Sequence, residues 1–313
     1  MTLQQLEYII AVDTHRHFVT AAEKCFVTQP TLSIMIQKLE DELAVKIFDR
    51  SKQPVVPTEI GKIIIERARL ILRETTTLRQ IIEEQKETIR GELRLGIIPT
   101  AAPYLAPLFI KKFSENNPEI KLYISELTTE NLIKKLKEDT LDVGIMATPI
   151  GDKELFEAPL FFEEFVVYSA KEEDILSKSF LLAKDIDVNR LVLLEEGHCM
   201  RTQIINLCEL KKATSMINNV YYEAGSIETL KKMIETHSGI TILPELAIQN
   251  LDEEQMKFVR YFKSPAPVRE MSLVTHRTFV KKRLIEALKK EIMENLPPQL
   301  RGQKTGKIMS VFN

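Results

Sequence analysis

The sequence has few cysteines, no excess of charge of one sign and no long apolar run. Its 313 residues include only three cysteines, an odd and small number that argues against a secreted domain held by disulfides. The 43 basic and 45 acidic side chains give a formal net charge of −2, which excludes a simple polycation, so any nucleic-acid contact must be a local patch. The least polar stretch, Leu95–Ile110, is broken by prolines and is too short to span a membrane.

The N-terminal sequence also lacks the basic start and the apolar core of a secretory signal. We therefore expect a cytoplasmic protein without membrane contact, in a reducing compartment where cysteine chemistry is transient or reactive. The chain length predicts two or three domains, at roughly 100–200 residues each.

The pattern of apolar residues in 1–58 predicts several short helices followed by a small wing. A second helix is expected to start at Phe18, with Thr20 as its cap, and a third follows after a break. Pro30 suits the first turn of that third helix, where its missing N–H costs nothing. Residues 48–57, with two prolines and several polar side chains, predict a loop or a small hairpin.

This order of elements predicts a winged helix-turn-helix, in which the second helix of the motif lies in the DNA major groove. Glutamine can pair with adenine, threonine and serine can reach a base or a phosphate, and an arginine on the wing can enter a neighbouring groove. The expected DNA contacts are Gln29, Pro30, Thr31, Ser33 and Arg50. Because acidic residues slightly outnumber basic ones in this region, a helical dimerisation domain that binds no DNA is the alternative.

Residues 59–90 predict a long linker helix, and from Gly91 the pattern changes to alternating strands and helices. The linker helix carries an apolar stripe that needs a partner, which indicates a dimerisation element. The alternation is typical of an α/β region with a mostly parallel sheet. Strands are expected at 93–98, 120–125, 143–147, 165–169, 191–194, 220–222, 240–243 and 271–275, and helices at 105–115, 130–138, 227–236 and 281–294.

Residues 91–300 are expected to form two lobes, and a cleft between two lobes is a natural ligand site. Segments 147–151 and 263–267 have the composition of crossings between the lobes. The polar, basic residues 301–313 predict a disordered tail. The expected boundaries are about 91–163 with 268–300 for lobe I and about 164–267 for lobe II.

Two cysteines lie close together in the sequence, Cys199 directly after an apolar strand and Cys208 further along the same segment. The strand-to-helix turn places Cys199 at a helix N-terminus beside His198 and Arg201, and all three features favour the thiolate. If the segment between the thiols is helical, their Cα atoms lie roughly 13–14 Å apart, whereas a disulfide needs about 4.4–6.8 Å. A disulfide would therefore unwind or displace the helix and act as a redox switch; the alternative is two unrelated thiols, with Cys208 buried and structural.

The sequence contains no motif for metal binding or catalysis. It has no C-x-x-C pair, no H-E-x-x-H, no G-x-S-x-G and no glycine-rich phosphate loop. His198 and Cys199 are neighbours, but adjacent side chains point in different directions and rarely form a nucleophile–base pair. Cys25 is expected to be a packed helical thiol. We therefore expect no enzyme activity, no metal and no cofactor.

The N-terminal residues resemble the LysR-type transcriptional regulators, and residues 239–244 resemble the regulatory domain of that family. The resemblance covers nearly the whole chain except its extreme C-terminal tail. It implies an α/β protein with an all-α winged helix-turn-helix N-terminal domain, a long linker helix and a two-lobed, periplasmic-binding-protein-like regulatory domain. The matching N-terminal residues are Leu6, Phe18, Ala21, Ala22, Gln29–Ser33, Ile36, Leu39, Glu40, Phe48, Arg50, Thr58 and Gly61.

Within the family, Gly197–Arg201 followed by Cys208 is similar to the peroxide-sensing members, as are residues 98–105 and 126–129. The resemblance implies that hydrogen peroxide oxidises Cys199 to a sulfenic acid, which Cys208 resolves to a reversible disulfide. At one implied pocket position, 202, those members usually carry an acidic residue, whereas the threonine here brings hydrogen bonding without charge. The implied peroxide pocket comprises Thr100, Thr129, His198, Thr202 and Arg269.

The resemblance also implies partners: promoter DNA, a homodimer or homotetramer paired through residues 59–88, RNA polymerase and a thiol reductant. Three other functions remain open. A LysR-type regulator of a small organic effector would respond normally without Cys199, and a thiol peroxidase would turn over without binding specific DNA. A solute-binding protein fits poorly with the helix-turn-helix and the missing signal sequence.

Overall fold

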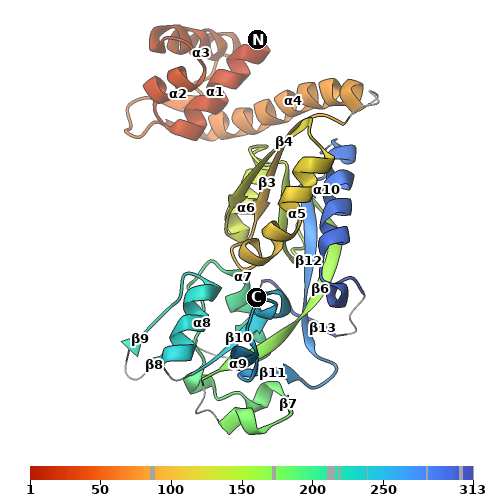
Figure 1. The fold of residues 1–313 in the computed structure, drawn as a ribbon. Coiled ribbons are helices and arrows are strands. Elements are labelled where there is room, and N and C mark those ends of the chain that lie inside the picture. The colour runs from red at the N-terminus through yellow and green to blue at the C-terminus, as the bar shows by residue number, and fades with distance from the viewer. Residues whose placement is uncertain are drawn as a thin grey trace. The chain divides into compact units, whose positions relative to one another are not determined.

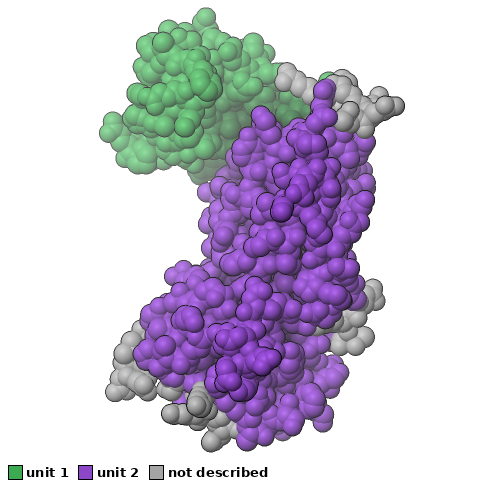
Figure 2. Space-filling view, viewed as in Figure 1, with its two compact units in different colours: residues 1–86 green, residues 87–313 purple. Residues whose placement is uncertain are grey.

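The computed structural model describes residues 1–84, 89–170, 174–209, 216–217, 220–237, 239–279, 281–302 and 306–312. The chain forms two compact units, residues 1–86 and residues 87–313 (Figure 2), and each unit has its own apolar core. Within the described ranges, no helix is long and apolar enough to cross a membrane.

The first unit is a helical domain with a two-stranded wing (Figure 1). Leu32, Ile36 and Leu39 are fully buried, which confirms the predicted apolar stripe of the third helix. The wing strands pair antiparallel, as the hairpin prediction required. The elements are α1 (Leu3–His15), α2 (Phe18–Lys24), α3 (Gln29–Leu43), β1 (Phe48–Asp49), β2 (Val56–Pro57) and α4 (Glu59–Glu84).

The start of α3 agrees with the prediction from the sequence, whereas the cap of α2 does not. Pro30 lies in the first turn of α3, as predicted. The prediction that Thr20 caps α2 is wrong, because the helix begins at Phe18 and a cap must precede its first residue. The cap is His17, whose Nδ1 accepts a hydrogen bond from the Thr20 backbone N–H.

Helix α4 confirms the predicted long helix as far as Glu84. Of the remaining predicted residues, 85–88 lie outside the described chain and 89–90 are not helical. Its first half packs on α1, where Arg69 Nη2 lies 2.7 Å from Asp13 Oδ2. The apolar side chains of Ile63 and Leu78 remain exposed, at 55% and 64%. Dimerisation through this helix stays a prediction.

The second unit is built on one nine-stranded sheet with helices packed on it (Figure 1). Its strand order is β4-β3-β5-β12-β6-β11-β7, while β10 pairs with β6 and β13 with β12. The strands are β3 (Gly91–Ile97), β4 (Ile120–Glu126), β5 (Val143–Thr148), β6 (Leu155–Ser169), β7 (Phe180–Leu181), β10 (Ile240–Pro244), β11 (Val259–Phe262), β12 (Pro267–His276) and β13 (Lys307–Ile308), with a separate hairpin of β8 (Met216–Ile217) and β9 (Val220–Tyr221).

The helices of this unit lie close to their predicted positions. Helix α8 has the predicted bounds, and α5, α6 and α10 begin within three residues of theirs. The α-helices are α5 (Ala102–Asn116), α6 (Thr129–Lys137), α7 (Cys199–Leu207), α8 (Ile227–Thr236), α9 (Glu253–Met256) and α10 (Lys282–Asn295); the 3₁₀ helices are η1 (Asp174–Ser177), η2 (Ala183–Asp185), η3 (Val188–Arg190), η4 (Glu245–Ile248) and η5 (Pro298–Leu300).

The sheet is mixed, not mostly parallel as the alternation suggested. Strands β6 and β12 run antiparallel to each other, and β6 continues beyond that pairing to meet β10 and β11. Segment 263–267 joins β11 to β12 and so lies on one of the two connections between the halves of the sheet. The predicted crossing at 147–151 is wrong, because it joins β5 to β6 and both of these strands pair with β12. The second connection is β6 itself.

Two other predictions differ from the structure. Residues 191–194 form only isolated bridges, from Leu191 to Ile240 and from Leu194 to Ala224, not a strand. The predicted disordered tail is wrong for residues 306–312, because β13 pairs with β12 and the apolar side chains of Met309 and Val311 are buried.

Candidate functional site

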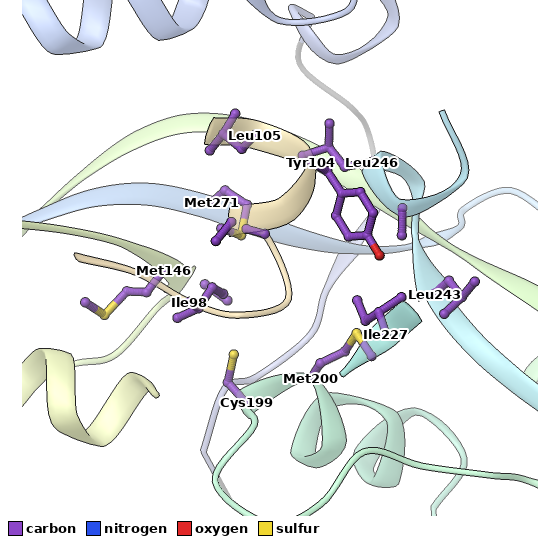
Figure 3. Close-up of a cluster of buried hydrophobic side chains, with 14 of the residues drawn as sticks. Ile98, Tyr104, Leu105, Met146, Cys199, Met200, Ile227, Leu243, Leu246 and Met271 are labelled. Atoms are coloured by element: carbon purple, nitrogen blue, oxygen red, sulfur yellow. The ribbon is translucent and has the colours of Figure 1, made fainter. Parts of the chain in front are cut away.

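Cys199 is the first residue of α7 and lies in a mostly apolar setting. Its residue exposure is 7%, and Figure 3 shows its sulfur directed toward Ile98 and the loop that leads into α5. Gly197 makes the turn before the helix with a φ of +94°, a conformation that residues with side chains rarely adopt. The predicted position of Cys199 at a helix N-terminus is therefore confirmed.

Cys208 lies at the other end of the same helix. It is the C-cap of α7, where its backbone N–H donates to the carbonyl of Ile204 at 3.0 Å, and both cysteines are free thiols. Burial raises the pKa of the Cys208 thiol to about 11. A helix of this length separates its ends by roughly 13 Å, so the two sulfurs cannot bond while α7 is intact.

His198 and Arg201, which lie beside Cys199 in the sequence, do not act as the sequence suggested. His198 is 7% exposed, and burial lowers its pKa more than Glu195 and the hydrogen bond to the Gly225 backbone raise it, so the imidazole is neutral near pH 7. Arg201 Nη1 donates to the Leu194 carbonyl, and Nη2 lies 2.9 Å from Glu223 Oε1. Of the three features that the sequence suggested beside Cys199, the helix N-terminus is the one that the structure retains unchanged.

Thr100 and Arg269, two predicted pocket residues, are in direct contact. The fully buried Arg269 donates from Nη1 to Thr100 Oγ1 at 3.1 Å and from Nη2 to the Thr100 carbonyl at 3.2 Å. Its Nε lies 2.7 Å from Oε1 of Glu163, which is also fully buried. The other oxygen of Glu163 accepts the Leu246 backbone N–H at 2.9 Å. Because the Thr100 hydroxyl accepts from Arg269, its own hydrogen is left for a further acceptor.

Thr129, another predicted pocket residue, has a buried hydroxyl for which the described residues provide no hydrogen-bond partner. It is the first residue of α6 and follows Thr128, whose Cγ2 lies 3.7 Å from the position of a Cβ built on Gly197. The turn that precedes Cys199 therefore packs on the N-terminus of α6. A buried, unpaired hydroxyl at such a place suits a small polar ligand. The remaining predicted residue, Thr202, is half-buried one turn after Cys199.

A second polar cluster, which was not expected from the sequence, links α5 to α8; Tyr104 and Lys231 are buried in it, whereas 54% of the Glu228 side chain is exposed. Tyr104 donates from its hydroxyl to Glu228 Oε1 at 2.6 Å, and Lys231 Nζ lies 2.7 Å from the same oxygen. Lys231 also lies 5.5 Å from the centre of the Tyr104 ring and donates to the Ala247 carbonyl. Burial raises the pKa of Tyr104, so it stays protonated. The i,i+3 spacing of Glu228 and Lys231 was the only sequence signal for this cluster.

The predicted DNA-contacting residues lie at the start of α3 and on the wing. Gln29, Pro30 and Thr31 are exposed, and the Thr31 hydroxyl lies 2.8 Å from that of Thr28, the N-cap of α3. Ser33 is half-buried, and its Oγ accepts a hydrogen bond from Arg50 Nη1 at 3.0 Å. The structure therefore brings Ser33 and Arg50 together.

The exposed face of the motif includes further residues that the sequence analysis did not single out. Ile34 and Gln37 follow Pro30 at helical spacing on the outer face of α3, and Ile34 is 53% exposed. Phe26, in the turn before α3, is 95% exposed with a φ of +56°. The helical spacing from Pro30 could have identified Ile34 and Gln37; nothing in the sequence marked Phe26 as exposed.

Comparison with known proteins supports both regions. Residues 3–62 match a model of the bacterial regulatory helix-turn-helix proteins of the LysR family, and residues 86–297 match the LysR substrate binding domain. The hydrogen peroxide-inducible genes activator of Pectobacterium carotovorum is 35% identical, over 88% of this chain and 90% of that protein. The transcriptional regulator EstR of Acinetobacter baylyi is 32% identical, over 88% of this chain and 91% of that protein.

A solved structure matches the chain over both units. A full-length OxyR variant from Pseudomonas aeruginosa is 33% identical and superimposes with a TM-score of 0.75, covering 93% of this chain and 97% of that one. These matches confirm the resemblance drawn from the sequence. The chain belongs to the LysR family of bacterial helix-turn-helix regulators.

Proposed function

We propose that this LysR-family protein is a peroxide-responsive transcription regulator whose switch is the Cys199–Cys208 pair. One observation carries the proposal: a buried thiol begins α7 and a second thiol ends it, so a bond between them must remodel the helix. In the first step the Cys199 thiolate attacks hydrogen peroxide and takes up one oxygen, and the second oxygen leaves as water after protonation. In the second step Cys208 displaces water from the sulfenic acid and forms the disulfide.

The residues around Cys199 would hold the peroxide and its leaving oxygen. The Thr100 hydroxyl accepts a hydrogen bond from Arg269, which Glu163 holds in place, so its own hydrogen remains for donation to the peroxide. The unpaired Thr129 hydroxyl and the neutral imidazole of His198 would complete the set, with Thr202 a further hydrogen-bonding group on the same helix. The high pKa of Cys208 keeps it protonated near pH 7, which disfavours Cys208 as the thiol that attacks peroxide.

Remodelling of α7 would break specific contacts. Met200 and Ile204 are almost fully buried on one side of the helix, and Gln203 Nε2 donates to the Met309 carbonyl at 3.0 Å. Met200, Gln203 and Ile204 lie between the two thiols, so an approach of the helix ends to disulfide distance would displace them from these contacts. The altered surface would change how copies of the regulatory domain meet and hence the spacing of their DNA-binding domains on the promoter.

The remaining roles follow from the family and the exposed face of α3. Gln29, Pro30, Thr31, Ser33 and Arg50 would contact promoter DNA, and the α4 helices would pair two chains within a homodimer or homotetramer. RNA polymerase would be the partner of the activated form. A thiol reductant in the cytoplasm would reset the disulfide, so the reaction with peroxide is stoichiometric and not enzymatic.

Substitution of the thiols tests this function. In cells that carry a promoter bound by the protein, Cys199→Ser should abolish the response to hydrogen peroxide and leave basal DNA binding intact. Cys25→Ser is the matched control, because that half-buried thiol lies in the other unit and burial raises its pKa. A peroxide response that persists in Cys199→Ser would refute the proposal.

One observation favours a second function: residues 86–297 match the LysR substrate binding domain. In that case the regulator would bind a small organic effector between the halves of its regulatory domain. The Cys199→Ser variant would then respond normally to the effector, and peroxide would have no effect on either form of the protein.

A further inference from the structure

We infer that Glu40 is a positioning residue for DNA binding: it holds the Arg50 guanidinium in the orientation that meets DNA. The inference rests on the proposed DNA contact of Arg50. Glu40 lies on α3 with only 1% of its side chain exposed, whereas 39% of the Arg50 side chain is exposed. Their shortest nitrogen–oxygen distance, from Arg50 Nη2 to Glu40 Oε2, is 3.3 Å.

The two carboxylate oxygens of Glu40 have different partners. Oε1 accepts the backbone N–H groups of Ile47 and Phe48, at 2.7 and 3.2 Å, and so joins α3 to the first strand of the wing. Oε2 faces two cations, Arg50 and Lys46, whose Nζ lies 3.6 Å away. This buried carboxylate, which accepts from two backbone donors and faces two cations, is held at a fixed position beneath an exposed arginine.

Arg50 is held from three sides. Besides Glu40, Ser33 Oγ accepts from its Nη1 at 3.0 Å, and its central carbon lies 5.0 Å from the centre of the Phe18 ring. A guanidinium has five N–H donors, and these contacts use one on each terminal nitrogen, so the others remain for a ligand. An arginine fixed in this way loses less side-chain entropy when it binds a phosphate or a base than a free one does.

The surface beside Arg50 leaves room for such a ligand. A hollow of about 490 Å³ lies between α3 and the wing, lined by residues that include Gln37, Lys46 and Arg50. All of these residues belong to the first unit, together with the exposed start of α3. Glu40 thus lies beneath a cation that faces this open hollow.

The substitution Glu40→Gln separates the two tasks of this side chain. Its carbonyl oxygen can still accept from the wing backbone, while its NH₂ group would face Arg50 and repel it. Electrostatics alone predicts tighter DNA binding, because a negative charge is removed near a polyanion. Positioning predicts weaker binding. The sign of the effect therefore discriminates between the two explanations.

The experiment measures the affinity of the full-length protein for a duplex that it selects from random-sequence DNA. We expect Arg50→Ala to weaken binding about tenfold and Glu40→Gln to weaken it at least about threefold. The double variant Glu40→Gln/Arg50→Ala should bind within about twofold of Arg50→Ala alone, because Glu40 then has nothing left to position. In a Lys46→Ala background, the matched control, the loss caused by Glu40→Gln should be undiminished.

Three results would overturn the inference, and they are distinguishable. Unchanged or tighter binding by Glu40→Gln would leave only its electrostatic effect. An equal loss with and without Arg50 would show that Glu40 acts on the fold of the domain and not through Arg50. No effect of Arg50→Ala would refute the proposed Arg50 contact itself.

A second variant keeps the test decisive if Glu40→Gln melts below the assay temperature. Arg50→Lys keeps the charge and leaves the wing contacts of Glu40 intact, but a single ammonium cannot reproduce the fork that engages Ser33 and Glu40 together. The Arg50→Lys variant should therefore lose most of the DNA affinity that Arg50→Ala loses. Wild-type affinity of Arg50→Lys would show that the charge of this residue suffices and that its orientation does not matter.

Discussion

Gln203 donates its side-chain amide to the main-chain carbonyl of Met309, 3.0 Å away, and so ties the helix between the two thiols to the C-terminal segment. Gln203 is fully buried, and the described residues provide no partner for its Oε1. The same segment is held by backbone hydrogen bonds to β12, including Met309 N–H to the Val268 carbonyl at 2.9 Å. A movement of α7 that displaces Gln203 would therefore remove a hydrogen bond that holds residues 306–312.

Oxidation should loosen the C-terminal segment. If the disulfide displaces Gln203, we expect the amide hydrogens of residues 306–312 to exchange about tenfold faster in the oxidised protein than in the reduced one. Hydrogen–deuterium exchange with mass spectrometry measures this difference. Cys199→Ser treated with the same peroxide is the control and should show no change. Equal exchange in the oxidised and reduced wild type would contradict a remodelled α7.

Replacing Thr129 by valine should separate stability from reactivity. The Thr129→Val variant removes a buried hydroxyl that has no partner among the described residues, so the free energy of unfolding should stay the same or rise by about 1 kcal/mol. The rate at which peroxide oxidises Cys199 should fall about tenfold if the hydroxyl holds the peroxide. Stopped-flow kinetics and denaturant unfolding measure the two quantities.

Thr148→Val is the matched control for that variant. The Thr148 hydroxyl is fully buried but bonded to Glu270 and Ser272, at 2.6 Å each. Its removal should cost about 1–3 kcal/mol of stability and leave the oxidation rate unchanged. An oxidation rate that falls equally in both variants would remove Thr129 from the peroxide pocket.

Burial of Cys208 predicts that the reduced protein loses stability at high pH. The folded thiol has a pKa of about 11, above its value in the unfolded chain, so the unfolded state releases a proton first as pH rises. The contribution of the buried Cys208 thiol to the free energy of unfolding is fully present below about pH 8.5. It declines as the pH rises to about 11, by no more than about 2 kcal/mol for a half-buried group. Thermal melting of the reduced protein from pH 8 upward, compared with Cys208→Ser, isolates this contribution. Parallel pH profiles of the two proteins would show that the thiol is not shielded.

Loss of Glu163 should destabilise the regulatory domain strongly. Glu163→Ala leaves the fully buried Arg269 without its counter-charge, which should cost about 3–5 kcal/mol. The exposed pair of Lys257 and Glu254 gives the control, since Glu254→Ala should cost less than about 1 kcal/mol. Urea unfolding of both variants measures the difference. A cost for Glu163→Ala as small as that of Glu254→Ala would show that the buried pair contributes little.

Local signals in the sequence located most of the helices, including the start of α7. Pro30 marked the start of α3, and the break before Cys199 marked the start of α7. The family resemblance named Thr100 and Arg269, which the structure brings into contact. In each case the decisive information lay within one turn of a helix or within a dense motif.

The misses share a physical cause, because they depend on contacts between distant segments. Glu163 lies 106 positions from Arg269, and Tyr104 lies 124 positions from Glu228, so no periodicity links the partners. The C-terminal segment has only two buried apolar residues in a polar context, and its order comes from pairing with β12. His198 was expected to favour a thiolate at the neighbouring cysteine, but burial, which the sequence does not reveal, lowers the pKa of its imidazole and so favours the neutral form.

The central claim is that Cys199 and Cys208 form a disulfide when peroxide arrives. The most direct test treats the reduced full-length protein with one equivalent of hydrogen peroxide and quantifies the Cys199–Cys208 peptide by mass spectrometry. We expect rapid, near-complete cross-linking in the wild type, and a sulfenic acid at Cys199 that a dimedone probe traps in Cys208→Ser. Absence of both the cross-link and the trapped sulfenic acid would contradict this claim and leave the cysteines as structural thiols.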